Sequence, residues 1–537
     1  MSFTRPSRRD LLKQAGLLSA AVATAPLAEA AVPTHAGVVE PQAAVKQLTA
    51  KGTSAANLFT EIGVRPILNA RGTYTIISGS QSLPEVKQAM FEASQYYVQL
   101  DELMAAVGKE IANLMGAPGA IVTCGCEAAI ALATVACMCG TDPEKSQAFP
   151  YKKAKSQVVI PGYARNQYDF ATRMAGADIV TADTDDELRA RLNDQVAMIY
   201  IISGPRAFQE PLSIKTICAI AREKGVPVFV DAAAEEPLVP NIHLQAGATF
   251  VGYSGGKCMR GPQTAGVLLG PPDLVKAAFW NAAPHHNWGR ALKVGKEEAM
   301  GMLAAVRMWY RRDHDAEQKQ WLSWDNYIGS ALKGIPSLTA EVEMPTADLS
   351  NRAPLLNIKW DASKVGITGT ELVKKLDEGT PRILVMGGAG RRPDMMDSSI
   401  TIMPYMMQPG DHKVVASVLS KLLRNPGSFS DPAKSSAPNA TVAGSWAVTI
   451  DYSVGTGRQQ LTLQQDGDTI VGKQAGEIFS ADLRGRVQGD HLELRSSMKA
   501  NGSQINFTFN GTVSGNSYSG DVSLGEYGAA KFTATKA

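Results

Sequence analysis

The sequence has no excess of charge of either sign. Its 53 lysines and arginines nearly balance 51 aspartates and glutamates, which leaves a formal net charge of +2 over 537 residues. No block of like charge marks a binding face. Recognition of nucleic acid or of an anionic membrane surface requires such a face. We therefore expect a small-molecule substrate, no nucleic-acid partner and no stable membrane insertion.

The N-terminal apolar stretch is too short to cross a membrane. It runs from Ala15 to Leu27, whereas a spanning helix needs roughly 20 apolar residues. It follows the twin-arginine pattern Ser7-Arg8-Arg9-Asp10-Leu11-Leu12-Lys13 and precedes the small-residue exit Ala28-Glu29-Ala30. We expect residues 1–30 to be a twin-arginine signal peptide, and the mature protein to be periplasmic or extracellular. An uncleaved membrane anchor is the alternative.

Cysteine is scarce and confined to one part of the chain. All six cysteines lie between residues 124 and 258, and the C-terminal third has none. Two pairs have C-x-C spacing, whereas structural metal sites usually use C-x2-C or similar spacing. Cys126 and Cys137 flank an apolar helical stretch, Ala128–Ala136. The pattern favours small buried thiols and no metal site.

The remaining composition, 45% hydrophobic and 19% charged, is that of a soluble globular protein with at least two cores. After an N-terminal arm (31–84), residues 85–318 alternate apolar strands with amphipathic helices such as Ile214–Lys224. This alternation predicts a mostly parallel sheet covered on both faces. The expected strands are Ala120–Thr123, Gln157–Ile160, Asp178–Val180, Ala197–Ile202, Val226–Val230, Phe250–Tyr253 and Gly266–Leu269.

Two further regions follow. Residues 319–427 predict a small α+β domain, with strands at Ala353–Trp360, Arg382–Val385 and Ser399–Ile402 and a closing helix at His412–Leu423. A linker rich in Ser, Pro and Ala (428–442) leads to residues 443–537, where eight short strands are separated by Gly, Asn and Asp turns. That spacing predicts an antiparallel barrel or sandwich. This module resembles, loosely, the lipocalin-like β modules of some exported bacterial enzymes.

The chemistry of the chain centres on one acid and one lysine. Asp231 ends the apolar strand Val226–Val230, and Lys257 follows after one more strand, in the turn Tyr253-Ser254-Gly255-Gly256-Lys257. A lysine amine can hold the aldehyde of pyridoxal 5'-phosphate (PLP) as an imine, while an acid keeps the pyridine nitrogen protonated. Both lie where ligands of such sheets bind, beyond the carboxyl ends of the strands.

PLP also needs a seat for its phosphate. In Thr123-Cys124-Gly125-Cys126-Glu127, a strand passes through a glycine turn into a helix whose free N–H groups suit an anion. Ser254 can add a hydroxyl to the same phosphate. We therefore predict cofactor contacts at Lys257, Asp231, Ser254, Gly256, Gly125, Cys126 and Glu127. The alternatives are a solvated lysine, a helix-capping Asp231 and a turn-stabilising Ser254.

Three phrases carry a family resemblance: Gly255-Gly256-Lys257 with Gly261-Pro262-Gln263, Asp231-Ala232-Ala233-Ala234, and Arg290 to Glu298. They resemble the fold-type-I PLP family that includes selenocysteine synthase (L-seryl-tRNA selenium transferase) and D-glucosaminate-6-phosphate ammonia-lyase. Asn69 to Tyr74 resembles the N-terminal active-site stretch of that family. The resemblance covers roughly residues 58 to 425. It implies a homodimer or larger homo-oligomer with shared active sites.

The chain departs from the family pattern at two places. Tyr163 stands where the family would have a histidine; an aromatic ring there can stack on the cofactor, but a proton shuttle is lost. The phosphate turn carries Cys124 and Glu127 where small or hydroxyl residues are usual. For the substrate carboxylate, Arg382 is the predicted catalytic clamp, with a surface arginine as the alternative. Weaker candidates for anion contacts are Arg71, Arg165, Arg290 and Lys296.

These features predict a PLP-dependent lyase that performs α,β-elimination, with loss of ammonia or water, on an amino acid or amino-sugar acid. An aminotransferase, a racemase or a selenium-transferase-like enzyme is the alternative within PLP chemistry. The alternative of another class is a catalytically silent envelope-binding protein. The presence of both Lys257 and Asp231 argues against it.

Overall fold

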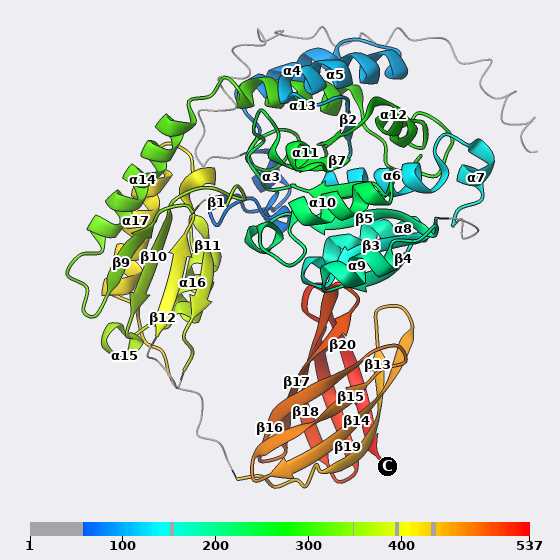
Figure 1. The fold of residues 1–537 in the computed structure, drawn as a ribbon. Coiled ribbons are helices and arrows are strands. Elements are labelled where there is room, and N and C mark those ends of the chain that lie inside the picture. Colours follow the sequence, from blue (N-terminus) through cyan, green and yellow to red (C-terminus); the bar gives the residue numbers. More distant parts are fainter. Residues whose placement is uncertain (1–56, 151–154, 347, 393–396, 431–436) are drawn as a thin grey trace, which may run out of the picture. The chain divides into compact units, whose positions relative to one another are not determined.

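The computed structural model describes residues 57–150, 155–346, 348–392, 397–430 and 437–537 (Figure 1). The expected signal peptide and part of the expected linker lie outside these residues. Among the helices that the structure describes, none is both long enough and apolar enough to cross a membrane.

A seven-stranded sheet forms the centre of the α/β part, in the order β2-β8-β7-β6-β5-β3-β4. The neighbours β4-β3, β3-β5, β5-β6 and β6-β7 are parallel, whereas β8 is antiparallel to β7 and β2. The predicted mostly parallel sheet is therefore confirmed. The strands are β2 (Ala120–Thr123), β3 (Gln157–Pro161), β4 (Asp178–Ala182), β5 (Val196–Ile202), β6 (Val228–Asp231), β7 (Phe250–Ser254) and β8 (Gly266–Leu269).

Helices surround this sheet (Figure 1). Helix α6 is apolar on all sides and packs across β2, β5, β6, β7 and β8, so it is buried along nearly its whole length. Helix α10 has one apolar stripe, begins after the capping Ser213 and packs on β6. The helices are α4 (Pro84–Ser94), α5 (Leu100–Met115), α6 (Cys126–Cys139), α7 (Pro143–Gln147), α8 (Phe170–Met174), α9 (Asp185–Arg191), α10 (Ile214–Glu223), α11 (Ile242–Ala246), α12 (Pro272–Trp280) and α13 (Lys296–Trp309).

A second sheet has five strands in the order β1-β11-β12-β10-β9. Its strand β1 comes from the segment predicted to be an N-terminal arm, and it pairs in parallel with β11, with Ile67 opposite Arg382. The small domain thus recruits a strand from outside residues 319–427. Its elements are α3 (Leu58–Glu61), β1 (Ile67–Ala70), α14 (His314–Ala331), β9 (Thr339–Glu343), β10 (Leu355–Trp360), α15 (Ala362–Val365), α16 (Gly369–Glu378), β11 (Arg382–Ala389), β12 (Ser398–Ile402) and α17 (Asp411–Arg424).

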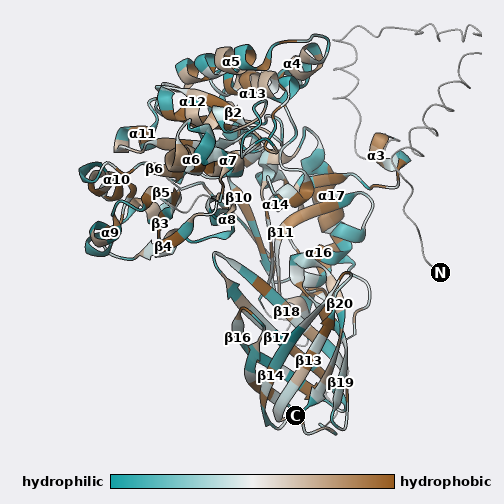
Figure 2. Cartoon of the chain, turned by 90° about the vertical axis from the view of Figure 1, so that its right-hand side faces the viewer, coloured by the Kyte–Doolittle hydropathy of each residue, from teal (hydrophilic) through white to brown (hydrophobic). Residues whose placement is uncertain are grey.

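The C-terminal strands close into an eight-stranded antiparallel barrel. Buried and exposed residues alternate along each strand, and hydropathy alternates with them (Figure 2). Trp446, Phe509, Tyr518 and Phe532 are fully buried and fill the interior, so side chains occupy the barrel core. The strands are β13 (Gly444–Asp451), β14 (Thr456–Asp466), β15 (Thr469–Ala475), β16 (Ser480–Gln488), β17 (His491–Ala500), β18 (Ser503–Ser514), β19 (Ser517–Ser523) and β20 (Ala529–Lys536).

Candidate active site

Asp231 is a buried acid surrounded by hydrogen-bond donors. It is the last residue of β6, and only 4% of it is exposed. Its carboxylate accepts hydrogen bonds from the Tyr200 hydroxyl (2.9 Å), the Cys126 thiol (3.3 Å) and the Ala233 backbone N–H (3.1 Å). Burial raises the pKa of Asp231, and these donors oppose the rise. Among the described residues no ion pair joins Asp231, so a cation such as a protonated pyridine suits this place.

Lys257 lies in the turn between β7 and β8, and its amine donates a hydrogen bond of 2.8 Å to the backbone oxygen of Thr73. Only glycine fits before it: a Cβ on Gly255 would lie 2.8 Å from the Ala265 oxygen, and one on Gly256 would collide with the side chain of Gln263. Partial burial lowers the pKa of the lysine, while the charge of Asp231 acts in the opposite direction. The charge of Asp231 therefore acts on the ionisation of Lys257.

Polar contacts around Thr73 bring together, beside Lys257, segments that lie far apart in the sequence. The Thr73 hydroxyl and the Tyr405 hydroxyl are 2.6 Å apart, and Tyr405 donates to Asn351 Oδ1 at 2.9 Å. The backbone N–H of Asn351 in turn donates to the oxygen of Ala234, in the loop that follows Asp231. Sequence reasoning missed Tyr405 and Asn351; no local pattern marks them, because their partners lie far away in the sequence.

The predicted anion seat has the expected geometry. Gly125 adopts φ +99°, a value that favours glycine, and α6 begins at the next residue with no side chain capping its first turn. A Cβ on Gly125 would meet no atom within 4 Å, so the space beside this turn is open. Glu127 lies in that first turn; loss of hydration, and then the charge of Asp231, raise its pKa. A phosphate here would have the helix N–H groups as donors and Glu127 as a neighbour.

The remaining cofactor candidates have less direct roles. The Tyr163 hydroxyl donates to the Leu212 oxygen (2.9 Å), and the guanidinium of Arg206 lies 4.4 Å from its ring centroid. Burial raises the pKa of Tyr163 to about 12, so it holds its proton at neutral pH. Ser254 ends β7, and its backbone N–H donates to the Ala233 oxygen at 3.2 Å, which ties the turn of Lys257 to the loop after Asp231.

Three of the arginine candidates, Arg382, Arg165 and Arg71, contact other side chains. Arg382 opens β11, and its Nε lies 2.7 Å from Asp377 Oδ1. A substrate carboxylate could bind the two terminal nitrogens, which this contact at Nε leaves free, and the clamp role stays a prediction. Arg165 pairs with the buried Asp169, and the guanidinium of Arg71 lies over the ring of Tyr74.

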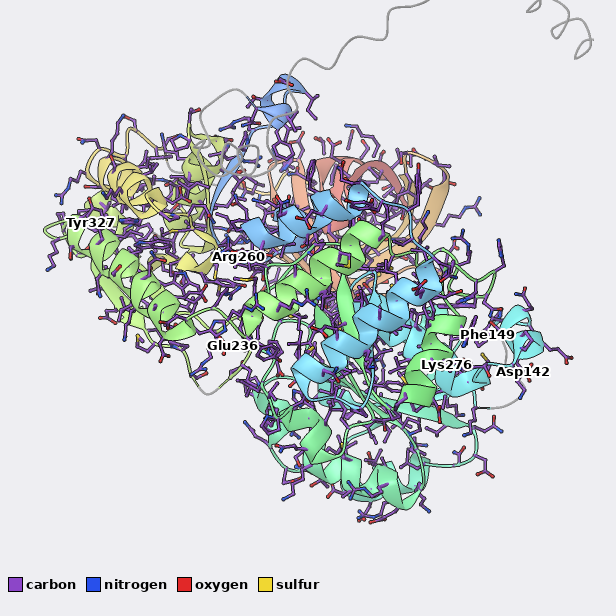
Figure 3. The ribbon with its side chains drawn as sticks, turned by 90° about the horizontal axis from the view of Figure 1, so that it is seen from above. Asp142, Phe149, Glu236, Arg260, Lys276 and Tyr327 are labelled. Atoms are coloured by element: carbon purple, nitrogen blue, oxygen red, sulfur yellow. The ribbon has the colours of Figure 1, made fainter. Side chains whose placement is uncertain are left out.

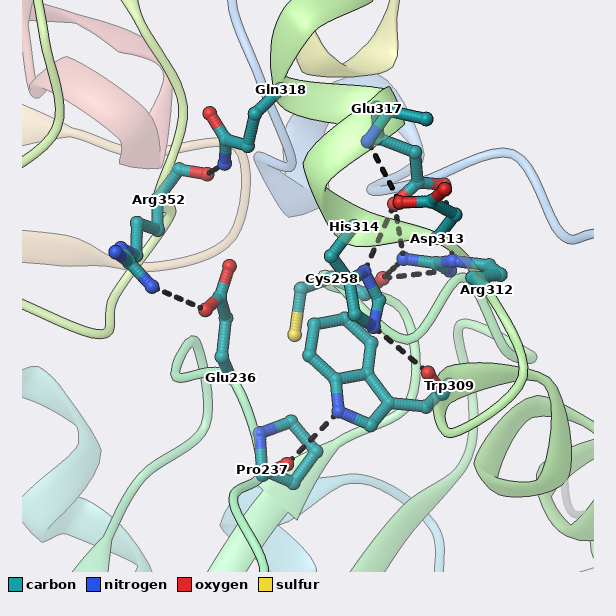
Figure 4. A network of polar contacts seen from close by, with 11 residues as sticks. Glu236, Pro237, Cys258, Trp309, Arg312, Asp313, His314, Glu317, Gln318 and Arg352 are labelled. Atoms are coloured by element: carbon teal, nitrogen blue, oxygen red, sulfur yellow. Dashed lines mark hydrogen bonds and ion pairs between the residues drawn. The ribbon is translucent and has the colours of Figure 1, made fainter.

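A charged network holds Cys258, the residue after Lys257 (Figure 4). Both terminal nitrogens of Arg312 donate to the backbone oxygen of Cys258, at 3.3 and 3.2 Å. Glu317 pairs with Arg312 at 3.1 Å and with His314 at 3.1 Å. Because Cys258 is adjacent to Lys257, these contacts fix the backbone on which the amine depends.

A small cavity lies within this network. Its volume is about 20 Å³, and its lining includes Arg260 and Glu236, which are labelled in Figure 3. That volume suits about one water molecule, not a substrate. Among the described residues no group of histidines, cysteines and acids is arranged to hold a metal ion.

Taken as a donor set, these groups fit PLP. A buried acid without a cationic partner suits the ring nitrogen, a half-buried amine suits the aldehyde, and an open glycine turn before a helix suits the phosphate. The fold is that of PLP-dependent enzymes of fold type I, followed here by the β-barrel.

Comparisons with known proteins agree with this fold. The structure of a D-glucosaminate-6-phosphate ammonia-lyase superposes with a TM-score of 0.60 and 25% identity, covering 68% of this chain and 98% of the other. In sequence, the chain is 26% identical over 336 residues to the D-glucosaminate-6-phosphate ammonia lyase of Salmonella typhimurium, which spans 60% of this chain and 87% of that protein.

Two other relatives have different activities. The 5'-C-glycyluridine monooxygenase-decarboxylase of a Streptomyces species is 27% identical over 382 residues, 69% of this chain and 92% of that protein. The L-seryl-tRNA(Sec) selenium transferase of Carboxydothermus hydrogenoformans is 25% identical over 396 residues, 67% and 74% of the two chains. No protein-family model matches the chain.

Proposed function

We propose that this protein is an exported PLP-dependent lyase that eliminates ammonia or water from an amino acid or an amino-sugar acid. One arrangement carries the proposal: the buried carboxylate of Asp231 and the half-buried amine of Lys257, at the ends of neighbouring strands. The similarity in fold to a D-glucosaminate-6-phosphate ammonia-lyase supports a lyase above the other PLP activities.

In such a reaction, different residues of the chain would have different roles. When bound, PLP supplies an electron sink that acidifies the proton on the amine-bearing carbon of the substrate. Because burial lowers its pKa, the Lys257 amine is more readily neutral and able to take that proton. Once it carries that proton, the Lys257 ammonium group can pass it to the leaving group.

The substrate carboxylate is assigned to Arg382, whose planar guanidinium can bind both oxygens. Its partner Asp377 would then orient the guanidinium through the 2.7 Å contact at Nε and leave the two terminal nitrogens for the substrate. A substrate amine bound at the cofactor and an acid bound at Arg382 are the two features that define an amino acid or amino-sugar acid.

A second copy of the chain is the expected partner. Large apolar side chains are exposed in the segment that leads to and follows Thr73: Leu58, Phe59, Ile62, Ile76, Tyr96 and Tyr97. Exposed apolar residues at this density mark contact surfaces. Because Thr73 contacts Lys257, a homodimer formed through this segment would bring the partner copy close to the active site. The mass of the purified protein in solution tests this.

Export is proposed from the twin-arginine pattern of Ser7 to Lys13. Twin-arginine export carries folded proteins, so the cofactor can be loaded in the cytosol before the protein reaches the periplasm or the medium. Fractionation of cells that express the full chain, with an Arg8→Lys and Arg9→Lys variant as control, tests the route.

Ammonia release tests the activity. We expect the protein, given a panel of amino acids and amino-sugar acids, to release ammonia and a keto acid without any added keto-acid acceptor. Lys257→Ala abolishes this, whereas Lys276→Ala on α12, labelled in Figure 3, does not. Strict dependence on an acceptor would instead indicate transamination, and a protein that binds no PLP would be a silent binding protein.

Oxidative decarboxylation is a second candidate. It is favoured by the similarity to the 5'-C-glycyluridine monooxygenase-decarboxylase, which extends over 69% of this chain. Oxygen uptake and carbon dioxide release during turnover would show this reaction; ammonia release at an unchanged oxygen concentration would show elimination.

A further inference from the structure

A wide groove lies on the outer face of the C-terminal barrel. This groove, formed entirely by β16 and β17, has a cavity volume of about 840 Å³, against about 10 and 20 Å³ for two other cavities. Leu483, Val487, Leu492 and Leu494 of the same two strands are buried in the barrel core. The charged residues of the groove alternate with them and therefore face outwards, as do Gln488, His491 and Ser497.

Three arginines dominate this groove. In the strand register, Arg484 lies opposite Arg495, and Arg486 lies opposite Glu493. Like charges placed directly opposite each other destabilise a β-sheet. Arg495 is compensated by Glu493, at 2.7 Å. Within the described part of the chain, no ion pair compensates Arg484 or Arg486. An anionic ligand would supply the missing charge.

The other groove residues restrict the kind of anion. Asp482 and Glu493 also line it, so a ligand with dense, uninterrupted negative charge, such as nucleic acid or an anionic bilayer, would meet repulsion. Ser497 and Gln488 offer neutral hydrogen-bonding groups. No phenylalanine, tyrosine or tryptophan lines the groove, so the imidazole of His491 is the one aromatic ring among its lining residues and gives a neutral sugar little surface to stack on. Separated carboxylates among hydroxyl groups are the matching pattern.

We propose that the β16–β17 groove binds a segment of an acidic polysaccharide, with carboxylates of the sugar units on Arg484, Arg486 and Arg495. Each guanidinium can grip a carboxylate through two parallel hydrogen bonds. Asp482 and Glu493 accept hydrogen bonds from sugar hydroxyls between the carboxylates. The barrel is then a module that holds the enzyme on an acidic glycan. This role does not depend on the proposed chemistry at Lys257.

Binding of defined oligosaccharides to the full chain tests the proposal. A hexamer of galacturonate is titrated at low ionic strength, with maltohexaose as the neutral control and phosphatidylglycerol vesicles as the anionic-surface control. We expect binding of the hexagalacturonate alone, weakened by added salt. The double variant Arg484→Ala, Arg495→Ala should weaken it by about tenfold or more.

Matched controls separate binding from folding. Arg458→Ala removes an exposed arginine of β14 that does not line the groove, and it should leave the affinity unchanged. Should the double variant melt at a lower temperature, Arg484→Gln alone serves in its place, because it also relieves the opposed charges. Ammonia release should be unaffected in all three variants. No binding of hexagalacturonate, equal binding of maltohexaose, binding of vesicles alone, or an equal effect of Arg458→Ala would overturn the proposal.

Discussion

Tyr200→Phe removes one hydroxyl from the carboxylate that is assigned to the cofactor ring. Tyr200 is fully buried, and its hydroxyl lies 2.9 Å from Asp231 Oδ2. A hydrogen bond to a charged group contributes about 1.5–3 kcal/mol. At 1.36 kcal/mol per pKa unit, its loss should raise the pKa of Asp231 by about 1–2 units. The phenylalanine ring can keep the contact with Phe229, whose centroid is 6.2 Å away.

The expected result is weaker and more acid-sensitive PLP binding. Asp231 pairs with a protonated ring only while it is ionised, and its pKa is already raised by burial. Affinity therefore falls as the pH drops through that pKa, and in the variant this fall should begin about 1–2 pH units higher. At pH values within the shifted range, we expect PLP affinity to fall by about 10- to 100-fold. Titration of apoprotein with PLP between pH 5 and pH 9, followed by absorbance, measures this.

Tyr253→Phe is the matched control. Tyr253 is equally buried and lies on β7, which pairs with the strand of Asp231, but its hydroxyl accepts a hydrogen bond from Asn241 Nδ2 at 2.7 Å. This variant should lose stability without changing the pH dependence of PLP binding. If both variants bind PLP like the unmodified protein, or if both lose affinity equally, the assignment of Asp231 to the ring is refuted.

Three further predictions concern single side chains. Cys126→Ser keeps a donor 3.3 Å from Asp231 and should retain PLP affinity, whereas Cys126→Ala should lower it several-fold, as PLP titration will show. Glu127→Gln removes a negative charge from the first turn of α6, so PLP affinity should rise by about two- to fivefold while the affinity for pyridoxal, which has no phosphate, stays the same. Asp325 is fully buried, and burial raises its pKa to about 8, against about 3.9 in the unfolded chain. Between these two pH values the folded state keeps the proton on Asp325 and the unfolded chain loses it, so the free energy of unfolding falls as the pH rises from about 4 to 8. Asp325→Asn should remove this fall. It should add on the order of 4 kcal/mol to the free energy of unfolding at pH 7 and nothing below pH 4. Denaturant unfolding of both proteins at pH 7 and below pH 4 measures this difference. A gain in the free energy of unfolding that is the same at both pH values would contradict the burial of a neutral Asp325.

Local patterns predicted most of the secondary structure. Strands β2 and β8 begin and end at the predicted residues, because short apolar runs between turn residues leave few other placements. All eight C-terminal strands were also predicted, and the barrel resolves the choice between barrel and sandwich. Strand β1 was missed as part of the small sheet, because its pairing with β11 joins residues more than 300 positions apart, and no local signal encodes such a partner.

In the candidate site, too, residues marked by local sequence patterns could be predicted, whereas contacts between distant segments could not. Asp231 and Lys257 could be named because each stands at the end of a recognisable strand. The support around them could not: Cys126 was expected at the phosphate turn, yet its thiol donates to Asp231. The backbone oxygen of Thr73, the contact of the lysine amine, depends on a loop that crosses from the second sheet. Similarly, the contact of Tyr163 with Arg206 arises from a loop that follows another strand.

Attachment of the cofactor tests the central claim most directly. Protein saturated with PLP is reduced with borohydride, digested and analysed by mass spectrometry. We predict one pyridoxyl group per chain, on the peptide that contains Lys257, and none in a Lys257→Ala variant treated in the same way. A pyridoxyl group on another lysine, or labelling that persists in the variant, would contradict the account.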